Sequence, residues 1–144
     1  MIVFADSSAL VKLYADEPGY EAVRALDRIV VSCLARVEVP AAIARKRRRR
    51  EIGGDTAEVL VAAFEADFLG TADEPGRFVV IGIVPALLDD AASLATRHGL
   101  RAYDAVQLAS AMAARATDPV CQGFACTDRA LRVAAAAERF RLVA

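Results

Sequence analysis

The chain has 144 residues, enough for one domain with a substantial core, because a domain of this size buries roughly 68% of the surface that its unfolded chain exposes. A net charge of −1 gives no overall nucleic-acid signature, and no apolar stretch approaches the roughly 20 residues that span a bilayer. The three cysteines form neither an even framework nor a CxxC pair. We therefore expect a single domain over residues 1–144, reduced thiols, a cytoplasmic location and no membrane contact.

Five short apolar segments are predicted to form β-strands, and most of the chain between them has helical periodicity. The first strand contains no polar residue, which is typical of a strand buried on both faces of a parallel sheet. Strands that alternate with helices predict an α/β fold, in which a mostly parallel sheet carries helices on both faces. The predicted strands are Ile2–Ala5, Ile29–Val31, Phe78–Ile83, Phe124–Cys126 and Phe140–Val143. The predicted helices are Ala9–Tyr14, Tyr20–Leu26, Cys33–Arg48, Thr56–Leu69, Leu87–Arg97, Tyr103–Ala114 and Arg129–Arg139.

Six basic residues follow one another from Arg45 to Arg50. The like charges of such a run repel one another, so the run either forms a solvated helix end or binds a polyanion. The sequence alone leaves both interpretations open.

Four acidic residues stand where an apolar segment becomes polar or where an apolar helical surface carries a charge: Asp6, Glu38, Asp104 and Asp128. Ligands of α/β proteins gather at the carboxyl ends of the strands, so these residues are candidates for one common site. Each has a structural alternative. Asp6 and Asp128 could act as helix N-caps, and Glu38 could face solvent. Asp104 could form a capping box with Gln107.

Four carboxylates in one cavity would require a cation or protonation. Each pair at about 5 Å repels by roughly 3 kcal/mol at an effective dielectric of about 20. Oxygen ligands without sulfur or imidazole favour Mg²⁺, with Mn²⁺ as an alternative, and Mg²⁺ usually bridges carboxylates to substrate phosphate. His98 is the only histidine, which excludes an HExxH zinc site and a two-histidine ribonuclease mechanism. The pattern points to metal-dependent phosphoryl chemistry.

The order of these motifs resembles the PIN-domain ribonucleases, specifically the VapC-type toxins of toxin–antitoxin pairs. The resemblance covers almost the whole chain, and its most specific part is the segment Leu100-Arg101-Ala102-Tyr103-Asp104-Ala105. It also rests on Asp6-Ser7-Ser8-Ala9-Leu10, on Glu38 after the second strand and on Thr127-Asp128-Arg129. One position departs from the family: Cys126 stands where Ser or Thr is frequent, which concerns the hydrogen bonding around Asp128.

The resemblance implies a Rossmann-like, three-layer α/β/α fold with a five-stranded sheet of order 3-2-1-4-5 and an acidic pocket for Mg²⁺. It implies an endoribonuclease toxin that cleaves structured RNA, forms homodimers and is blocked by a cognate VapB-type antitoxin. By position, Asp6 and Asp104 would be the main metal ligands, with Asp128 an additional or water-mediated one. Glu38 would orient or deprotonate water. Ser8, and Thr127 beside the last acid, would support these carboxylates.

Metal activation of water has consequences for the products. The ion would polarise a phosphate oxygen and lower the pKa of a water held in line with the scissile bond. Because water rather than the ribose 2′-hydroxyl attacks, we expect 5′-phosphate and 3′-hydroxyl ends. Flanking phosphates would be contacted without sequence choice by Arg47, Arg48, Arg49 and Arg50.

Other functions fit parts of the pattern. A response-regulator receiver needs a lysine near its last strand, whereas the only lysines are Lys12 and Lys46. A haloacid-dehalogenase-like phosphatase needs a second acid two residues after Asp6, where Ser8 stands. Two alternatives stay open: a non-catalytic PIN-like interaction module, to which the 56% apolar composition is also suited, and a PIN nuclease that processes RNA without a toxin role.

Overall fold

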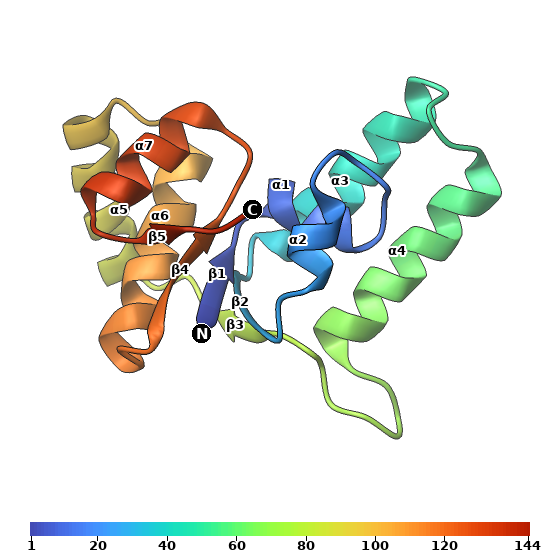
Figure 1. Ribbon diagram of the computed structural model, residues 1–144, viewed down its shortest axis with the longest axis horizontal. Helices are drawn as coiled ribbons and strands as arrows, with labels where there is room; N and C mark the ends of the chain where they lie inside the picture. The colour runs from blue at the N-terminus through green and yellow to red at the C-terminus, as the bar shows by residue number, and fades with distance from the viewer.

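The computed structural model describes all residues, 1–144, and is built around a five-stranded sheet in which every pair of neighbouring strands is parallel (Figure 1). The strand order is β3-β2-β1-β4-β5, so the predicted fold class and the strand order implied by the resemblance are confirmed. The strands are β1 (Ile2–Ala5), β2 (Arg28–Ser32), β3 (Val79–Ile81), β4 (Cys121–Ala125) and β5 (Arg141–Leu142).

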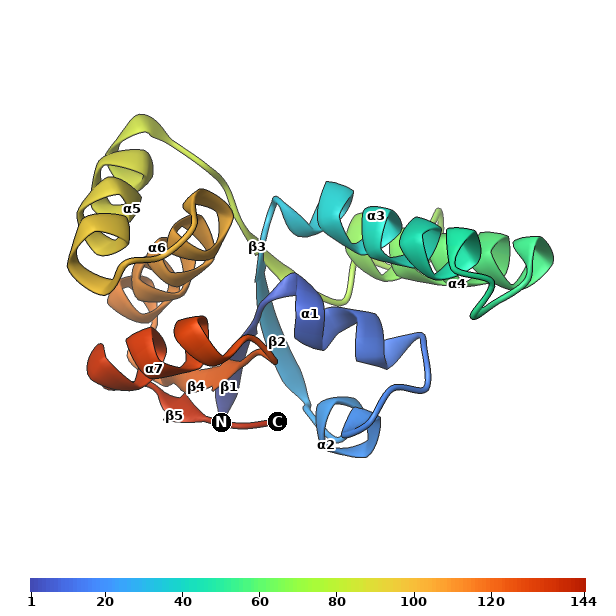
Figure 2. The same ribbon diagram turned by 90° about the horizontal axis from the view of Figure 1, so that it is seen from above.

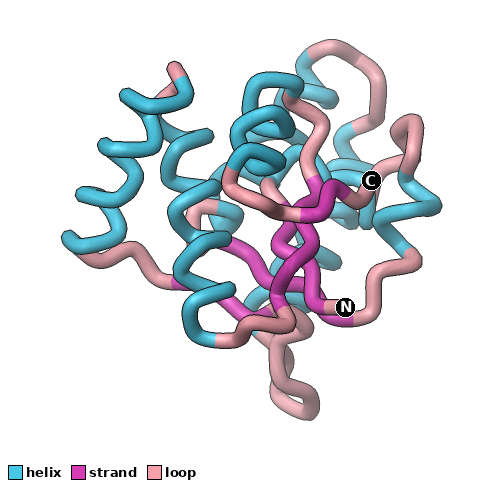
Figure 3. Tube along the Cα trace, turned by 60° about the vertical axis from the view of Figure 1, so that its left-hand side comes forward, coloured by secondary structure: helices cyan, strands magenta, loops and turns pink.

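Helices cover both faces of the sheet, and the strands run through the middle of the molecule (Figure 3). Figure 2 shows α3 and α4 as a hairpin that extends away from the sheet on one side, while α5, α6 and α7 lie together on the other. None of the helices is long and apolar enough to cross a bilayer. The helices are α1 (Ser7–Leu10), the 3-10 helix η1 (Val11–Leu13), α2 (Tyr20–Arg24), α3 (Ala35–Arg48), α4 (Gly54–Leu69), α5 (Pro85–His98), α6 (Ala102–Thr117) and α7 (Arg129–Ala137).

Alternation along the central strands divides the core into two halves. Ile2 and Phe4 of β1 pack against α5, α6 and α7, and Phe4 stacks on Phe124 with ring centroids 5.5 Å apart. Val3 and Ala5 face the opposite side, towards α1, α3 and α4. Because successive side chains of a strand point to opposite faces, a central strand between two helical layers must be apolar throughout.

Most helix and strand boundaries differ from the predicted ones by a few residues, and three of these differences are described here. The strand β4 begins at Cys121 rather than Phe124, because Gly123 packs so closely on Val3 that an added Cβ would lie 2.8 Å from the valine Cγ2. The strand β3 ends at Ile81, two residues earlier than expected. The first helix begins at Ser7 rather than Ala9, because the carboxylate of Asp6 already accepts a hydrogen bond from the helix N-terminus.

Candidate active site

The four predicted acids line one cavity of about 560 Å³ at the carboxyl ends of the central strands. Asp6 follows β1, Glu38 lies in the first turn of α3, Asp104 lies in the first turn of α6, and Asp128 follows β4. The chain reverses at this edge of the sheet each time that a strand passes into a helix. Three of these transitions, after β1, β2 and β4, therefore meet in one place, and the start of α6, which follows α5, brings Asp104 beside them.

Asp6 is the most buried of these acids, with 6% of its surface exposed. Its Oδ1 accepts hydrogen bonds from the Ser8 hydroxyl at 2.7 Å and from the Ala9 amide at 3.0 Å, so the residue does cap α1. Burial raises the pKa of Asp6 to about 6; the two hydrogen bonds oppose the rise, and the charges of Glu38 and Asp104 add to it.

Glu38 is held against α1 and α6 rather than facing solvent. Its Oε1 accepts hydrogen bonds from the Ser7 hydroxyl at 3.0 Å and from Gln107 Nε2 at 2.7 Å. Gln107 is itself 3% exposed, and its amide nitrogen also lies 3.3 Å from the Ser7 oxygen. Gln107 is thus committed to Glu38, and the N-cap of α6 is Arg101, so the capping-box alternative for Asp104 does not hold.

Asp104 and Asp128 share the guanidinium of Arg101. Arg101 Nε donates to Asp104 Oδ2 at 3.1 Å, and its other nitrogen lies 3.6 Å from Asp128 Oδ2. Asp128 also caps α7, because its Oδ1 accepts a hydrogen bond from the Leu131 amide at 2.9 Å. The Arg101 side chain is 79% exposed and is therefore free to leave when another cation approaches.

In each carboxylate one oxygen accepts a hydrogen bond and the other accepts none, although Asp128 Oδ2 is ion-paired with Arg101 at 3.6 Å. The accepting atoms are Asp6 Oδ1, Glu38 Oε1, Asp104 Oδ2 and Asp128 Oδ1. No group of three or more histidine, cysteine, aspartate or glutamate side chains is arranged to hold a metal ion as these side chains stand. Unbonded carboxylate oxygens around a cavity are, however, the donor set that a hard divalent ion takes, with water completing its coordination. The residues therefore fit a divalent cation.

The predicted supporting residues are joined to one another. The Ser8 hydroxyl donates to Asp6 and accepts from the backbone amide of Thr127 at 3.0 Å, so Thr127 contributes its main chain and its side chain is exposed. Cys126 is buried, and its Sγ lies 3.7 Å from the Asp128 carbonyl oxygen. Burial raises the pKa of Cys126 to about 12, so the thiol is neutral and is only a weak donor where a hydroxyl is frequent in the family.

The predicted arginines lie on different sides of α3. Arg49 lines a second cavity beside the acidic one, and Arg45, outside the predicted contact set, lines both. Arg47 turns towards α4, where its guanidinium lies close to Gly54. Arg48 and Arg50 are exposed. The arginine side chains therefore point in different directions around the helix and do not form one patch.

Sequence reasoning missed Arg45, Arg101 and Gln107 as cavity residues. Arg45 is seven residues after Glu38, a spacing that places two side chains on one helical face. The sequence could therefore have predicted Arg45 as a neighbour of Glu38 in the cavity. Arg101 is three residues before Asp104, which permits an ion pair across one helical turn. The contact between Gln107 and Glu38 spans 69 residues, and no local pattern indicates it.

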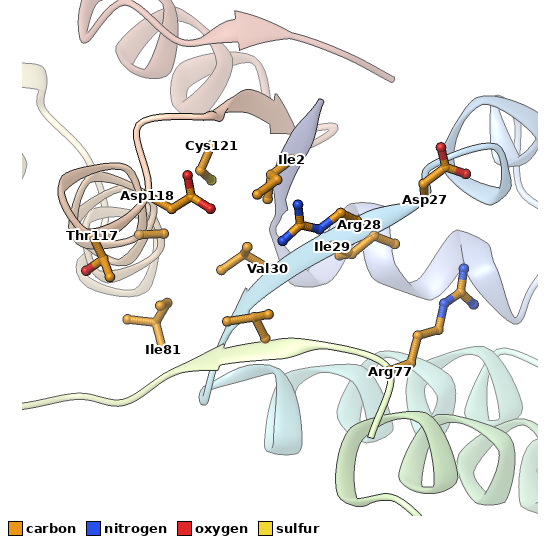
Figure 4. A pocket seen from close by; sticks show the side chains of 12 residues that line it. Ile2, Asp27, Arg28, Ile29, Val30, Arg77, Ile81, Thr117, Asp118 and Cys121 are labelled. Carbon is orange, nitrogen blue, oxygen red and sulfur yellow. The ribbon is translucent and has the colours of Figure 1, made fainter. Parts of the chain in front are cut away.

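A separate cavity of about 180 Å³ lies at the opposite ends of the strands (Figure 4). It is lined by the first residues of β1, β2 and β4 and by the end of α6, and its wall is mainly apolar around Ile2, Val30 and Ile81. The carboxylates that converge in the first cavity are absent from this one. We therefore place the candidate site at the carboxyl ends of the strands.

The comparison with protein families agrees with this geometry. The family model described as "PIN domain" matches residues 3–136. The chain belongs to the PIN domain family. This confirms the family that the motifs indicated, and no curated protein matches the chain significantly.

Two solved structures share the fold of this PIN domain. FitAcB from Neisseria gonorrhoeae is 21% identical with a TM-score of 0.58, and the match covers 99% of this chain and 96% of that one. VapC20 of Mycobacterium tuberculosis, described as a sarcin-ricin loop cleaving toxin, is 16% identical with a TM-score of 0.60. That match covers 92% of this chain and 94% of VapC20. At these identities the likeness establishes the fold.

Proposed function

We propose that this PIN domain is a divalent-metal-dependent endoribonuclease and the VapC-type toxin of a toxin–antitoxin pair, acting on structured RNA in the cytoplasm. The observation that carries the proposal is the convergence of Asp6, Glu38, Asp104 and Asp128 on one cavity, each with an unbonded oxygen. The toxin described as cleaving the sarcin-ricin loop, which shares the fold, supports the choice of RNA.

Asp6, Asp104 and Asp128 would hold Mg²⁺, or Mn²⁺ in its place. When bound, such an ion supplies Lewis acidity towards a phosphate oxygen and lowers the pKa of bound water. Arg101 would leave Asp104 and Asp128 and turn its charge towards the phosphate. Its guanidinium matches the geometry of phosphate oxygens, so the exchange keeps the local charge balanced.

Glu38 is our candidate for orienting the attacking water and accepting its proton. Its Oε1 is fixed by Ser7 and Gln107, its Oε2 has no hydrogen-bond partner, and the residue lines the cavity. A fixed carboxylate can hold water in line with the scissile P–O bond. The water adds to phosphorus as the bond to the 3′-oxygen breaks. The products are a 5′-phosphate and a 3′-hydroxyl, and a 2′,3′-cyclic phosphate would contradict this step.

The rim of the cavity supports a protein partner. Val37 and Tyr103 line the mouth and are largely exposed, although both are apolar enough to favour burial. A VapB-type antitoxin that covers them would also exclude RNA from the acids. We further propose that the toxin is a homodimer, which sedimentation equilibrium of the purified chain would test.

The replacement Asp104→Asn tests the enzyme directly. Removing a carboxylate that would hold the cation should lower Mg²⁺-dependent cleavage of total cellular RNA by about 100-fold or more, with the fold retained by circular dichroism. Asp90→Asn, which removes an exposed charge on α5, is the matched control and should keep full activity. Equal cleavage by both variants, or none by the parent chain, would favour the interaction module.

Mapping the cleaved ends distinguishes a toxin from an RNA-processing nuclease. A toxin should produce internal cuts that inactivate a structured RNA, and growth should stop unless the antitoxin is co-expressed. Ends that coincide with the termini of mature ribosomal RNA, without growth arrest, would assign the processing role instead.

A further inference from the structure

One face of α3 joins the acidic cavity to a basic surface. Glu38, Ala42, Arg45 and Arg49 follow one another at intervals of three or four residues, so they lie in a row along the helix. The acidic cavity is lined by Glu38, Ala42 and Arg45 from this row. Beyond it the row continues to Arg49.

A second cavity, of about 320 Å³, continues along this row. It shares Ser8, Ala42 and Arg45 with the acidic cavity, and its further charged residues are Arg49, Lys46, Glu17 and Glu51. The shared Ser8 is the residue whose hydroxyl binds Asp6 at 2.7 Å, so the two cavities meet directly beside the most buried acid.

The basic side chains of this second cavity differ in what they are free to bind. Lys46 is neutralised within the protein, because its Nζ lies 2.5 Å from Glu17 and 3.3 Å from Glu51. Arg45 and Arg49 are exposed, and neither guanidinium makes a hydrogen bond or ion pair. Two unpaired guanidinium groups one helical turn apart, about 6 Å along the axis, therefore face the cavity.

We propose that Arg45 and Arg49 form a phosphate subsite for the nucleotides next to the scissile bond, which gives the RNA a fixed direction along α3. This rests on the proposed function, because it takes the acidic cavity as the place of the scissile phosphate. A nucleic acid carries a phosphate at every step of its backbone, so a strand that leaves the acidic cavity on the Ser8 side brings its neighbouring phosphates to Arg45 and Arg49. Guanidinium groups bind such phosphates through paired hydrogen bonds.

The other arginines of the run are not part of the proposed subsite. Arg47 is turned towards α4, and Arg48 and Arg50 line neither cavity. This distribution permits a matched experiment. Arg45→Gln with Arg49→Gln removes the subsite, whereas Arg48→Gln with Arg50→Gln removes the same charge from the same helix end. Glutamine keeps most of the alkyl stem, so packing changes little.

The test is the salt dependence of RNA binding in EDTA, where metal-dependent cleavage stops. The probe is a short fluorescein-labelled single-stranded RNA of mixed sequence, followed by anisotropy. Each phosphate contact on a single strand contributes about 0.7 to the slope of log affinity against log salt. The Arg45/Arg49 variant should therefore lose about 1.4 from the slope, and the Arg48/Arg50 variant should stay close to the parent chain.

Equal slopes for the two double variants, or no measurable binding by the parent chain, would overturn the subsite. Displacement of the RNA by poly-glutamate at the same charge concentration would overturn it as well and would assign the face to an acidic polypeptide. Cleavage in Mg²⁺ is measured separately. If the parent chain cleaves RNA but the Arg45/Arg49 variant keeps the parent's salt slope, the subsite alone is disproved. If the salt slope of this variant falls but the parent chain does not cleave RNA, the nuclease alone is disproved.

Discussion

Asp6 uses its two carboxylate oxygens differently. The Oδ1 atom accepts hydrogen bonds from the Ser8 hydroxyl and the Ala9 amide, as in a helix N-cap, while the other oxygen has no hydrogen-bond partner and the residue lines the acidic cavity. A residue that only capped a helix would gain nothing from being 6% exposed beside two other acids. Its placement costs stability, and such costs are typical of functional sites.

Replacing Asp6 with Asn should therefore stabilise the metal-free protein at neutral pH. Burial raises the pKa of Asp6 from 3.8 to about 6, so the folded chain binds the extra proton and the free energy of unfolding falls as the pH rises through this range. Asparagine keeps the cap without the charge. We expect a gain of about 2–3 kcal/mol above pH 7, measured by urea unfolding in EDTA.

The gain should disappear near pH 4, where the parent carboxyl is protonated in the folded state. Asp90→Asn, on the exposed side of α5, should show neither the gain nor its pH dependence. A gain for Asp6→Asn that is the same at both pH values would show that burial of the charge is not its cause.

Gln107 is a positioning residue for Glu38. Gln107→Leu removes the 2.7 Å hydrogen bond to Glu38 Oε1, and the apolar, slightly smaller leucine also removes the buried Oε1 of Gln107, which has no partner. Stability should change by less than about 1 kcal/mol. We expect kcat for RNA cleavage to fall about 10-fold with little change in KM.

Gln122→Leu is the matched control, because the Gln122 amide lies on the surface and donates only to a backbone carbonyl oxygen. It should leave kcat unchanged. A rise in KM alone after Gln107→Leu, or a large loss of stability, would assign Gln107 to substrate binding or to the core.

Among single residues, the sequence predicts the four acids and the nearby supports Ser8 and Thr127, but not the distant support Gln107. Asp6 and Asp128 stand at the ends of apolar strands, where the change of polarity is local and visible. Gln107 lies inside an apolar helix, and its partner Glu38 is on another element. Only the fold shows that this buried amide belongs to the site.

Among the helices, Glu138 ties the end of α7 to α5 and to α6, and α6 carries Asp104. Its Oε1 accepts from His98 Nε2 at 2.8 Å and from Arg97 at 2.7 Å, both at the end of α5. Arg115 of α6 donates to the Glu138 carbonyl oxygen at 3.0 Å, just after the end of α7. These bonds hold α6, whose first turns carry Asp104 and Gln107.

Glu138→Gln should cost about 1–2 kcal/mol of unfolding free energy at neutral pH. The hydrogen bond from His98, followed by the one from Arg97, holds the pKa of Glu138 below its ordinary value of 4.5. The stabilisation is therefore complete above that value and is lost as the pH falls below it. The difference between variant and parent should shrink in acid, as urea unfolding across this range would show.

Glu58→Gln, on the exposed side of α4, provides the comparison and should be neutral throughout. If the Glu138 variant were as destabilised at pH 3 as at pH 7, its effect would come from packing rather than from charge.

The element boundaries were predictable only where local chemistry marks them. Gly99, with a φ of 64°, ends α5 as a left-handed cap, as its position after His98 indicates. The start of β4 was missed, because Gln122 and Gly123 do not look like strand residues until Val3 is placed beside them. The face of α3 that each arginine occupies depends on the exact phase of the helix, which a contiguous basic run does not reveal.

At the scale of the whole molecule, the parallel sheet creates the site. Its two core halves hold β1 rigidly between helical layers, and the strand order places β2, β1 and β4 side by side. Their carboxyl ends therefore open into one cavity. Alternating strands and helices predict this architecture, whereas the sheet order and the meeting of the acids are long-range properties that the family resemblance supplied.

The most direct test of the account is anomalous diffraction from crystals of the chain soaked in Mn²⁺. We expect a strong peak in the acidic cavity, within bonding distance of carboxylate oxygens of Asp6 and Asp104, and its loss from crystals of Asp104→Asn. Manganese found only elsewhere on the surface, or an undiminished peak in the variant, would contradict it.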